Sequence, residues 1–79
     1  MLKVELRVFA TLRQFAPQIP LGGMTIEVEP GNTLRDLMHA LNLPEEQVKI
    51  VMRNNVQADL DDFVQDGDRV AYIPAVAGG

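Results

Sequence analysis

Hydrophobic and polar residues alternate along three segments of the chain. The first alternation covers residues 2–9 and sets its apolar side chains against Lys3, Glu5 and Arg7. Shorter alternations follow at residues 24–29 and 69–73. Successive side chains of a strand point to opposite faces, so these segments predict half-buried β-strands. Phe9 is the exception in the first segment, because its position places a large apolar side chain on the charged face.

The segment after residue 32 has the spacing of a helix. Its apolar residues recur at intervals of three and four, which is the period of one helix face. They are Leu34, Leu37, Met38 and Leu41. Thr33 caps the predicted first turn together with Asp36, and Asn42 stands at the exit. A shorter helix of one or two turns is predicted over residues 11–16.

Short turns divide the rest of the chain into further strands. Asn54-Asn55 suits a two-residue turn that requires positive φ. Residues 50–52 before it are therefore predicted as a short buried strand, and Val56 begins the returning strand. A second turn over residues 66–68 precedes the last strand. Val70 and Tyr72 on that strand are predicted to point inward, which leaves Ala71 and Ile73 on the outer face.

The order of elements is strand, strand, helix, then two or three short strands. A single helix across one face of a small mixed sheet buries that face and leaves the other in water. This α+β arrangement is a β-grasp, or ubiquitin-like, fold. The handedness of its connections makes the last strand a parallel neighbour of the first, in the middle of the sheet. A ferredoxin-like fold is the main alternative, but it needs two comparable helices, and the segment 11–16 is too short.

Length and composition indicate one small domain. The chain has 79 residues and a mass of 8.7 kDa, so we expect a single domain over residues 1–79 with a flexible tail from about residue 75. No apolar run approaches the roughly 18 residues of a membrane span, and the first residues lack the apolar stretch of a signal peptide, which favours a cytoplasmic protein. The net charge of −4 and the aromatic content of 5% argue against nucleic-acid binding.

Side chains offer few candidates for chemistry. Cysteine is absent, which excludes thiolate catalysis, disulfides and cysteine-based zinc sites. His39 is the single histidine and is interpreted as a solvated helix residue, and Gly22-Gly23 lacks the pattern of a phosphate loop. Five residues do not follow the spacing of a calcium loop and are interpreted as solvated turn residues: Asp59, Asp61, Asp62, Asp66 and Asp68. Three inward positions are predicted to fill the core: Met24, Met38 and Met52. We therefore expect no metal and no bound cofactor.

The C-terminus is the one place where reactive chemistry is expected. The chain ends in Gly78-Gly79, after the last predicted strand and a short apolar segment. Two glycines carry no side chain and can enter a narrow channel in conformations that are closed to other residues. The α-carboxylate is ionised at neutral pH and is a poor electrophile, so acyl transfer would require activation, most simply as a mixed anhydride with AMP. On the glycines alone, a frayed tail without function is an equally good interpretation.

Four segments together resemble the MoaD/ThiS family of ubiquitin-like sulfur carriers over essentially the whole chain. They are residues 9–13 (FATLR), 33–37 (TLRDL), 66–70 (DGDRV) and 74–79 (PAVAGG). The resemblance implies that a ubiquitin-activating-enzyme-like adenylyltransferase uses ATP to adenylate Gly79, and that sulfur then replaces the AMP to leave a thiocarboxylate. It also implies an acceptor enzyme that takes the sulfur, and it makes the chain a co-substrate rather than an enzyme.

Two features of the sequence indicate different branches of this family. Residues 9–13 and the short helix after them are most similar to the small subunit of molybdopterin synthase, which makes the large subunit the expected acceptor. That subunit typically ends with two prolines and Ser or Thr before the glycines, whereas residues 74–79 are similar to carriers for cysteine synthesis. Three alternatives stay open. They are a carrier for thiamine or tRNA thiolation, a protein modifier joined to lysines, and an interaction module with an inert terminus.

Exposed apolar residues predict a docking surface for these partners. Phe9 and Ile73 should lie close together on the outer face if the first and last strands are parallel neighbours, and Val56 can join them at the same edge. A contiguous apolar patch beside a reactive tail is typical of a binding site. The resemblance implies that these three positions contact both the adenylyltransferase and the acceptor. The tail residues predicted to contact the same partners are Pro74, Val76 and Ala77.

Overall fold

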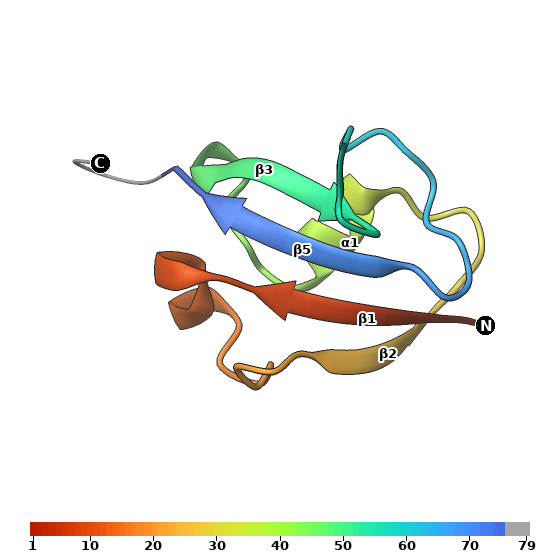
Figure 1. Cartoon of the computed structure of the whole chain (residues 1–79), viewed down its shortest axis with the longest axis horizontal. Coiled ribbons are helices and arrows are strands. Elements are labelled where there is room, and N and C mark those ends of the chain that lie inside the picture. The colour runs from red at the N-terminus through yellow and green to blue at the C-terminus, as the bar shows by residue number, and fades with distance from the viewer. Residues whose placement is uncertain (76–79) are drawn as a thin grey trace.

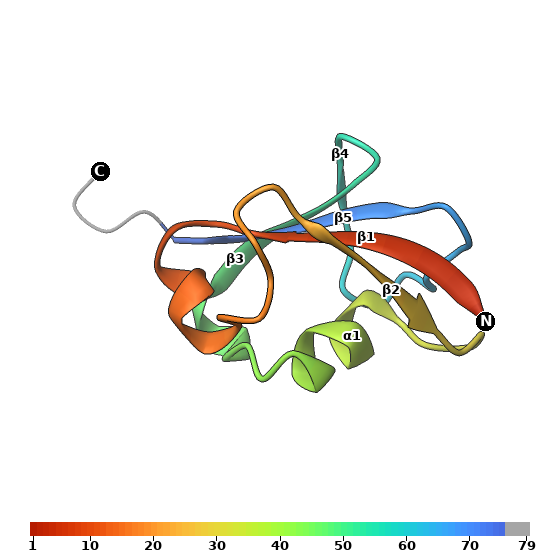
Figure 2. The same ribbon diagram turned by 90° about the horizontal axis from the view of Figure 1, so that it is seen from below.

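The structure is a computed structural model and describes residues 1–75. Within these residues the chain forms a five-stranded sheet, one α-helix and two 3-10 helices (Figure 1). In chain order the elements are β1 (Leu2–Val8), η1 (Ala10–Phe15), β2 (Met24–Val28), α1 (Leu34–Ala40), η2 (Glu45–Gln47), β3 (Val48–Arg53), β4 (Val56–Ala58) and β5 (Arg69–Pro74). The helix α1 covers one face of the sheet and leaves the other face open (Figure 2). The predicted β-grasp fold is confirmed.

β1 and β5 lie side by side at the centre of the sheet, whose strand order is β2-β1-β5-β3-β4. These two strands run parallel, with Leu6 opposite Val70 and Val8 opposite Tyr72, and every other pair is antiparallel. The parallel central pair is the one that the sequence predicts. A ferredoxin-like fold is excluded, because only the six-residue 3-10 helix η1 stands between β1 and β2. No helix within residues 1–75 is long and apolar enough to cross a membrane.

Side chains from the central strands and from α1 meet in the core. The largest fully buried side chains are Tyr72, Leu6, Leu12, Leu34, Met38, Val4 and Val70. The Tyr72 hydroxyl donates a hydrogen bond of 2.7 Å to the backbone carbonyl oxygen of Leu34, the first residue of α1. A buried phenol requires such a partner. This bond therefore joins the middle of β5 to the start of the helix.

The helix α1 begins and ends where the sequence predicts. The Thr33 hydroxyl accepts a hydrogen bond of 3.2 Å from the backbone N–H of Asp36, and the Asp36 carboxylate accepts one of 3.0 Å from the backbone N–H of Thr33. The two bonds form a capping box. The bond from the Thr33 backbone is the main cause of the lowered pKa of Asp36. Asn42 follows the helix with a φ of 60°, a left-handed conformation that commonly ends helices.

The three methionines predicted to fill the core lie in three environments. Met38 is fully buried, and Met24 is partly buried against the core. Met52 lies on the open face, where it is paired with Ala71, so the prediction of a core position is wrong. Residues 50–52 are three consecutive apolar residues without alternation. Only the pairing of Val51 with inward-facing Tyr72 decides that Met52 points outward.

The buried tyrosine makes the stability of the fold sensitive to alkaline pH. Burial raises the pKa of the Tyr72 phenol well above the ordinary value of about 10. Because the folded state has the raised pKa, the contribution of Tyr72 to stability is complete below about pH 10 and is lost as the pH rises further. The chain has one tyrosine, so phenolate absorbance reports this group alone. We expect phenolate to form only together with unfolding, followed by circular dichroism. Phenolate near pH 10 in a folded chain would contradict this prediction.

Candidate functional site

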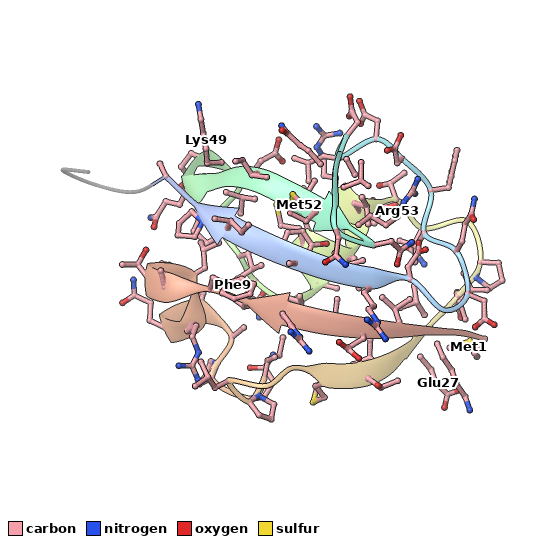
Figure 3. The ribbon with its side chains drawn as sticks, in the orientation of Figure 1. Met1, Phe9, Glu27, Lys49, Met52 and Arg53 are labelled. Atoms are coloured by element: carbon pink, nitrogen blue, oxygen red, sulfur yellow. The ribbon has the colours of Figure 1, made fainter. Side chains whose placement is uncertain are left out.

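The open face of the sheet brings together residues from β1, β3 and β5. The register sets Arg7 beside Ala71, and Ala71 beside Met52. The backbone N–H of Phe9 donates a hydrogen bond of 3.2 Å to the carbonyl oxygen of Tyr72. This bond continues the register of β1 and β5 and sets Phe9 level with Ile73, as predicted. Figure 3 looks onto this face and shows Phe9 and Met52 on neighbouring parts of it.

A hollow of about 130 Å³ lies on the open face. The residues around it are Glu5, Arg7, Phe9, Met52, Asn55, Arg69, Val70 and Ala71. Its apolar side includes Phe9, which is 40% exposed. On its charged side Arg7 forms an ion pair with Glu5, with a nitrogen–oxygen distance of 3.3 Å. Pockets for small molecules usually exceed about 300 Å³, so this hollow suits a side chain of a partner protein better than a cofactor.

Met52 and Asn55 border this site although the sequence does not predict them there. Asn54 and Asn55 have φ angles of 55° and 68°, as the predicted two-residue turn requires. The turn is fixed by the Asn54 side chain, whose amide donates to the Asp68 carboxylate at 3.1 Å and whose oxygen accepts from the backbone N–H of Arg69 at 2.9 Å. These bonds join residues far apart in the chain, and such a contact leaves no periodic pattern in a sequence.

The predicted contact residues Ile73 and Val56 lie on different faces of the sheet. Ile73 is half-buried on the open face, near Phe9. Val56 is 67% exposed, but it pairs with Arg53, and Arg53 pairs with inward-facing Val70. The prediction that Val56 joins the other two residues is therefore wrong. Successive side chains of β3 point to opposite faces of the sheet, so Met52 points to the open face and Arg53 to the other. Val56 is paired with Arg53 and therefore points to the same face as Arg53.

The last described residues leave the sheet at the edge where Phe9 lies. β1 and β5 are parallel, so both strands end at this edge (Figure 1). Pro74 is the final residue of β5, pairs with Val48 and is buried. It therefore belongs to the sheet, which corrects its predicted place in the tail, whereas Ala75 is exposed. The remaining predicted site residues, Val76, Ala77, Gly78 and Gly79, lie outside the described residues.

The aspartates serve the turns of the chain. Among the described residues, no three His, Asp or Glu side chains are placed to hold a metal ion. Asp66 accepts a hydrogen bond of 2.7 Å from the backbone N–H of Lys3. Asp68 differs from its neighbours, because it is 5% exposed and its carboxylate accepts bonds from Asn54 and from the backbone N–H of Gln65, the latter at 2.8 Å. The interpretation of Asp68 as a solvated residue is wrong, since these donors hold it inside the turn.

His39 belongs to a charged network on the surface of α1. Its Nε2 lies 3.1 Å from Glu45 Oε1, and Arg35 Nε lies 3.3 Å from the other oxygen of Glu45. The hydrogen bond with His39 is the main cause of the lowered pKa of Glu45. Arg35 also pairs with Asp61, which is the main cause of its raised pKa. The His39 side chain is 56% exposed, and exposed pairs of this kind contribute little to stability.

Several solved structures share this fold over nearly their whole length. SAMP1 from Haloferax volcanii is 25% identical, with a TM-score of 0.69, covering 98% of this chain and 99% of that chain. The complex of subunits 1 and 2 of the molybdopterin-converting factor from Helicobacter pylori contains a chain that is 26% identical, with a TM-score of 0.62 and coverage of 99% and 100%. Urm1 from Trypanosoma brucei is 17% identical, with a TM-score of 0.70 and coverage of 98% and 95%, and shows a likeness of fold alone. No curated protein matches the sequence.

These likenesses define a class of small ubiquitin-like proteins that serve as sulfur carriers or as modifiers. The sequence matches the ThiS family over residues 6–79. The chain belongs to the ThiS family, as the resemblance of its four sequence segments implies. Small carriers of this kind are generally not catalysts themselves.

We expect Asp68→Ala to lower the free energy of unfolding by about 1–3 kcal/mol, because the buried carboxylate is the acceptor for two part-buried N–H donors, on Asn54 and Gln65. Asp61→Ala is the matched control, since Asp61 is exposed and its carboxylate pairs with Arg35 on the surface. The control should cost less than about 1 kcal/mol. Urea denaturation of both variants measures the difference. Equal losses would show that the buried carboxylate does not hold the turn.

Proposed function

We propose that this protein is a sulfur carrier whose C-terminal glycine is adenylated, converted to a thiocarboxylate and used for molybdopterin synthesis in the cytoplasm. The observation that carries the proposal is the layout of the open face. β5 directs a chain that ends in Gly78-Gly79 to the edge where Phe9 is exposed. Membership of the ThiS family supports the carrier role. The likeness to the molybdopterin-converting factor complex from Helicobacter pylori supports the pathway and a second subunit as the sulfur acceptor.

The proposed reaction uses the main-chain carboxylate of Gly79 and no side chain. A carboxylate oxygen attacks the α-phosphorus of ATP, and pyrophosphate leaves. Hydrosulfide then attacks the carbonyl carbon of the acyl adenylate. A carbon–sulfur bond forms, the bond from carbon to the AMP oxygen breaks, and AMP leaves with the electron pair. ATP binding and the groups that stabilise the leaving phosphates belong to the adenylyltransferase.

The chain contributes recognition to this scheme. Phe9 and Ile73 lie together at the end of the sheet from which the tail departs, so a partner that binds them has the terminus within reach of its own catalytic centre. Holding two reactants in one complex makes their reaction effectively unimolecular. The open face thus positions the terminus without taking part in the chemistry.

A protein modifier is a second candidate function, favoured by the likeness to SAMP1. It requires the same adenylate of Gly79, but a lysine amine takes the place of sulfur and forms an amide. The carriers for cysteine, thiamine or tRNA thiolation differ from the first proposal only in the acceptor. The modifier and all of these carriers share the activation of Gly79 and the docking face. Tests of those two features therefore apply to every candidate.

We expect deletion of Gly79 to abolish ATP–pyrophosphate exchange by the adenylyltransferase of the same organism. The deletion leaves Gly78 as the terminus, one residue short of the adenylating centre, and it touches none of the elements within residues 1–75. Circular dichroism should show an unchanged fold. Addition of one residue after Gly79 is the companion variant and should be equally inactive. Exchange at the wild-type rate in either variant would overturn the proposal of terminal activation.

We expect Phe9→Ala to weaken binding to the same adenylyltransferase by about 2 kcal/mol, a factor of roughly thirty, as truncation of an apolar anchor does. Phe63→Ala is the matched control, because Phe63 is 63% exposed and does not border the hollow on the open face. It should bind as the wild type does. Affinity from isothermal calorimetry is compared with the unfolding free energy of each variant. Equal affinities for the two variants, or a loss explained by unfolding, would remove Phe9 from the docking face.

A further inference from the structure

The charges of the molecule are distributed unequally between its two sides. The outward positions of the sheet carry three basic side chains against two acidic ones: Lys3, Arg7 and Arg69 against Glu5 and Glu27. The remainder of the chain has four basic residues against nine acidic ones, which gives the overall charge of −4. The open face is therefore the positive side of an acidic protein. Such an asymmetry orients a charged partner before contact.

Arg69 occupies the central position of this positive region. It borders the hollow beside Phe9 and also a second hollow of about 180 Å³ at the other end of the face, which includes Lys3 and Thr25. Its place in β5, beside Glu5 of β1, sets it between the apolar end and the charged end of the face.

The backbone of Arg69 is held by two hydrogen bonds to Asn54. Its N–H donates to the Asn54 side-chain oxygen at 2.9 Å, and its carbonyl oxygen accepts from the Asn54 backbone N–H at 2.8 Å. The adjacent Asp68 carboxylate is buried and bonded to the same asparagine. The starting point of the Arg69 side chain is thus set before any partner binds, which lowers the entropy lost on binding.

The Arg69 guanidinium has no hydrogen-bond or ion-pair partner within residues 1–75. Three of the other four arginines have such partners: Arg7 pairs with Glu5, Arg35 with Glu45, and Arg53 donates to the carbonyl oxygen of Phe63. The fourth, Arg13, has none within residues 1–75 but does not border the hollows of the open face. A guanidinium offers five donors in a planar fork that matches a carboxylate. Arg69 therefore offers this fork beside the hollow next to Phe9, and no group within residues 1–75 pairs with it.

We propose that the open face selects a protein partner whose docking surface is apolar at its centre and carries a carboxylate that pairs with Arg69. The inference rests on the proposed function and names the chemistry of the adenylyltransferase surface that binds this face. Phe9 and Met52 meet the apolar part of that surface, and Arg69 and Arg7 meet its acidic rim. A nucleic acid does not fit this face, because its three basic residues against two acidic ones suit a single carboxylate and not a run of phosphates.

The test compares Arg69→Glu with Arg13→Glu in binding to the purified adenylyltransferase. Both substitutions change the net charge equally, and Arg13 is an exposed residue of η1, outside the hollows of the open face. We expect Arg69→Glu to slow association at least tenfold at low salt and to flatten the dependence of the association rate on ionic strength. Arg13→Glu should change the rate less than threefold. Arg69→Gln, which has the size of the glutamate variant without its charge, should give an intermediate rate.

The outcomes separate this inference from the proposed function. Suppose that the wild-type protein is adenylated and the Arg69→Glu variant associates with the adenylyltransferase at the wild-type rate. This result would overturn the inference of an acidic rim on the partner and leave the proposed function intact. Equal effects of the Arg69 and Arg13 reversals would overturn it as well, because they would reflect net charge. Circular dichroism and urea denaturation of each variant establish that the fold is intact. Wild-type protein that is not adenylated would instead contradict the proposed function.

Discussion

The parallel pairing of β1 with β5 fixes the geometry on which the rest of the molecule depends. The inward side chains of both strands build the core, and their outward side chains build the open face. Because the strands are parallel, they end at the same edge of the sheet, and Phe9 leaves β1 where β5 leads toward the C-terminus. Two parts of the chain that are far apart in sequence are neighbours for this reason.

Alternate positions of β5 serve the core and the proposed docking face. Tyr72 and Val70 are buried, and Tyr72 is bonded to the first residue of α1. Ala71 and Arg69 point to the open face, where a substitution changes the surface without opening a cavity. The proposed reactive group is a main-chain carboxylate, so the chain needs no catalytic side chain. Under this proposal, a protein without cysteine and with one histidine has the group that sulfur transfer needs.

The sequence predicts those features that depend on local pattern. Strand alternation, the capping box of α1 and the Asn54-Asn55 turn follow from spacing and residue type, and the structure contains all of them. The features that it does not predict depend on pairing between distant segments. Met52 and Val56 are assigned to their faces by the register of β3, and Asp68 is buried because its hydrogen-bond donors surround it. The proposed reactive residue Gly79 lies outside the described residues, and the hollow beside Phe9 requires three strands in register.

Mass spectrometry of the chain isolated from its native cells tests the central claim most directly. The sulfur-carrier account predicts a C-terminal peptide in which sulfur replaces one carboxylate oxygen of Gly79, and a loss of this form when the adenylyltransferase is removed. A chain that carries only an ordinary carboxylate, with Gly79 recovered in amide bonds to lysines of other proteins, would contradict the account and assign the protein to the modifiers.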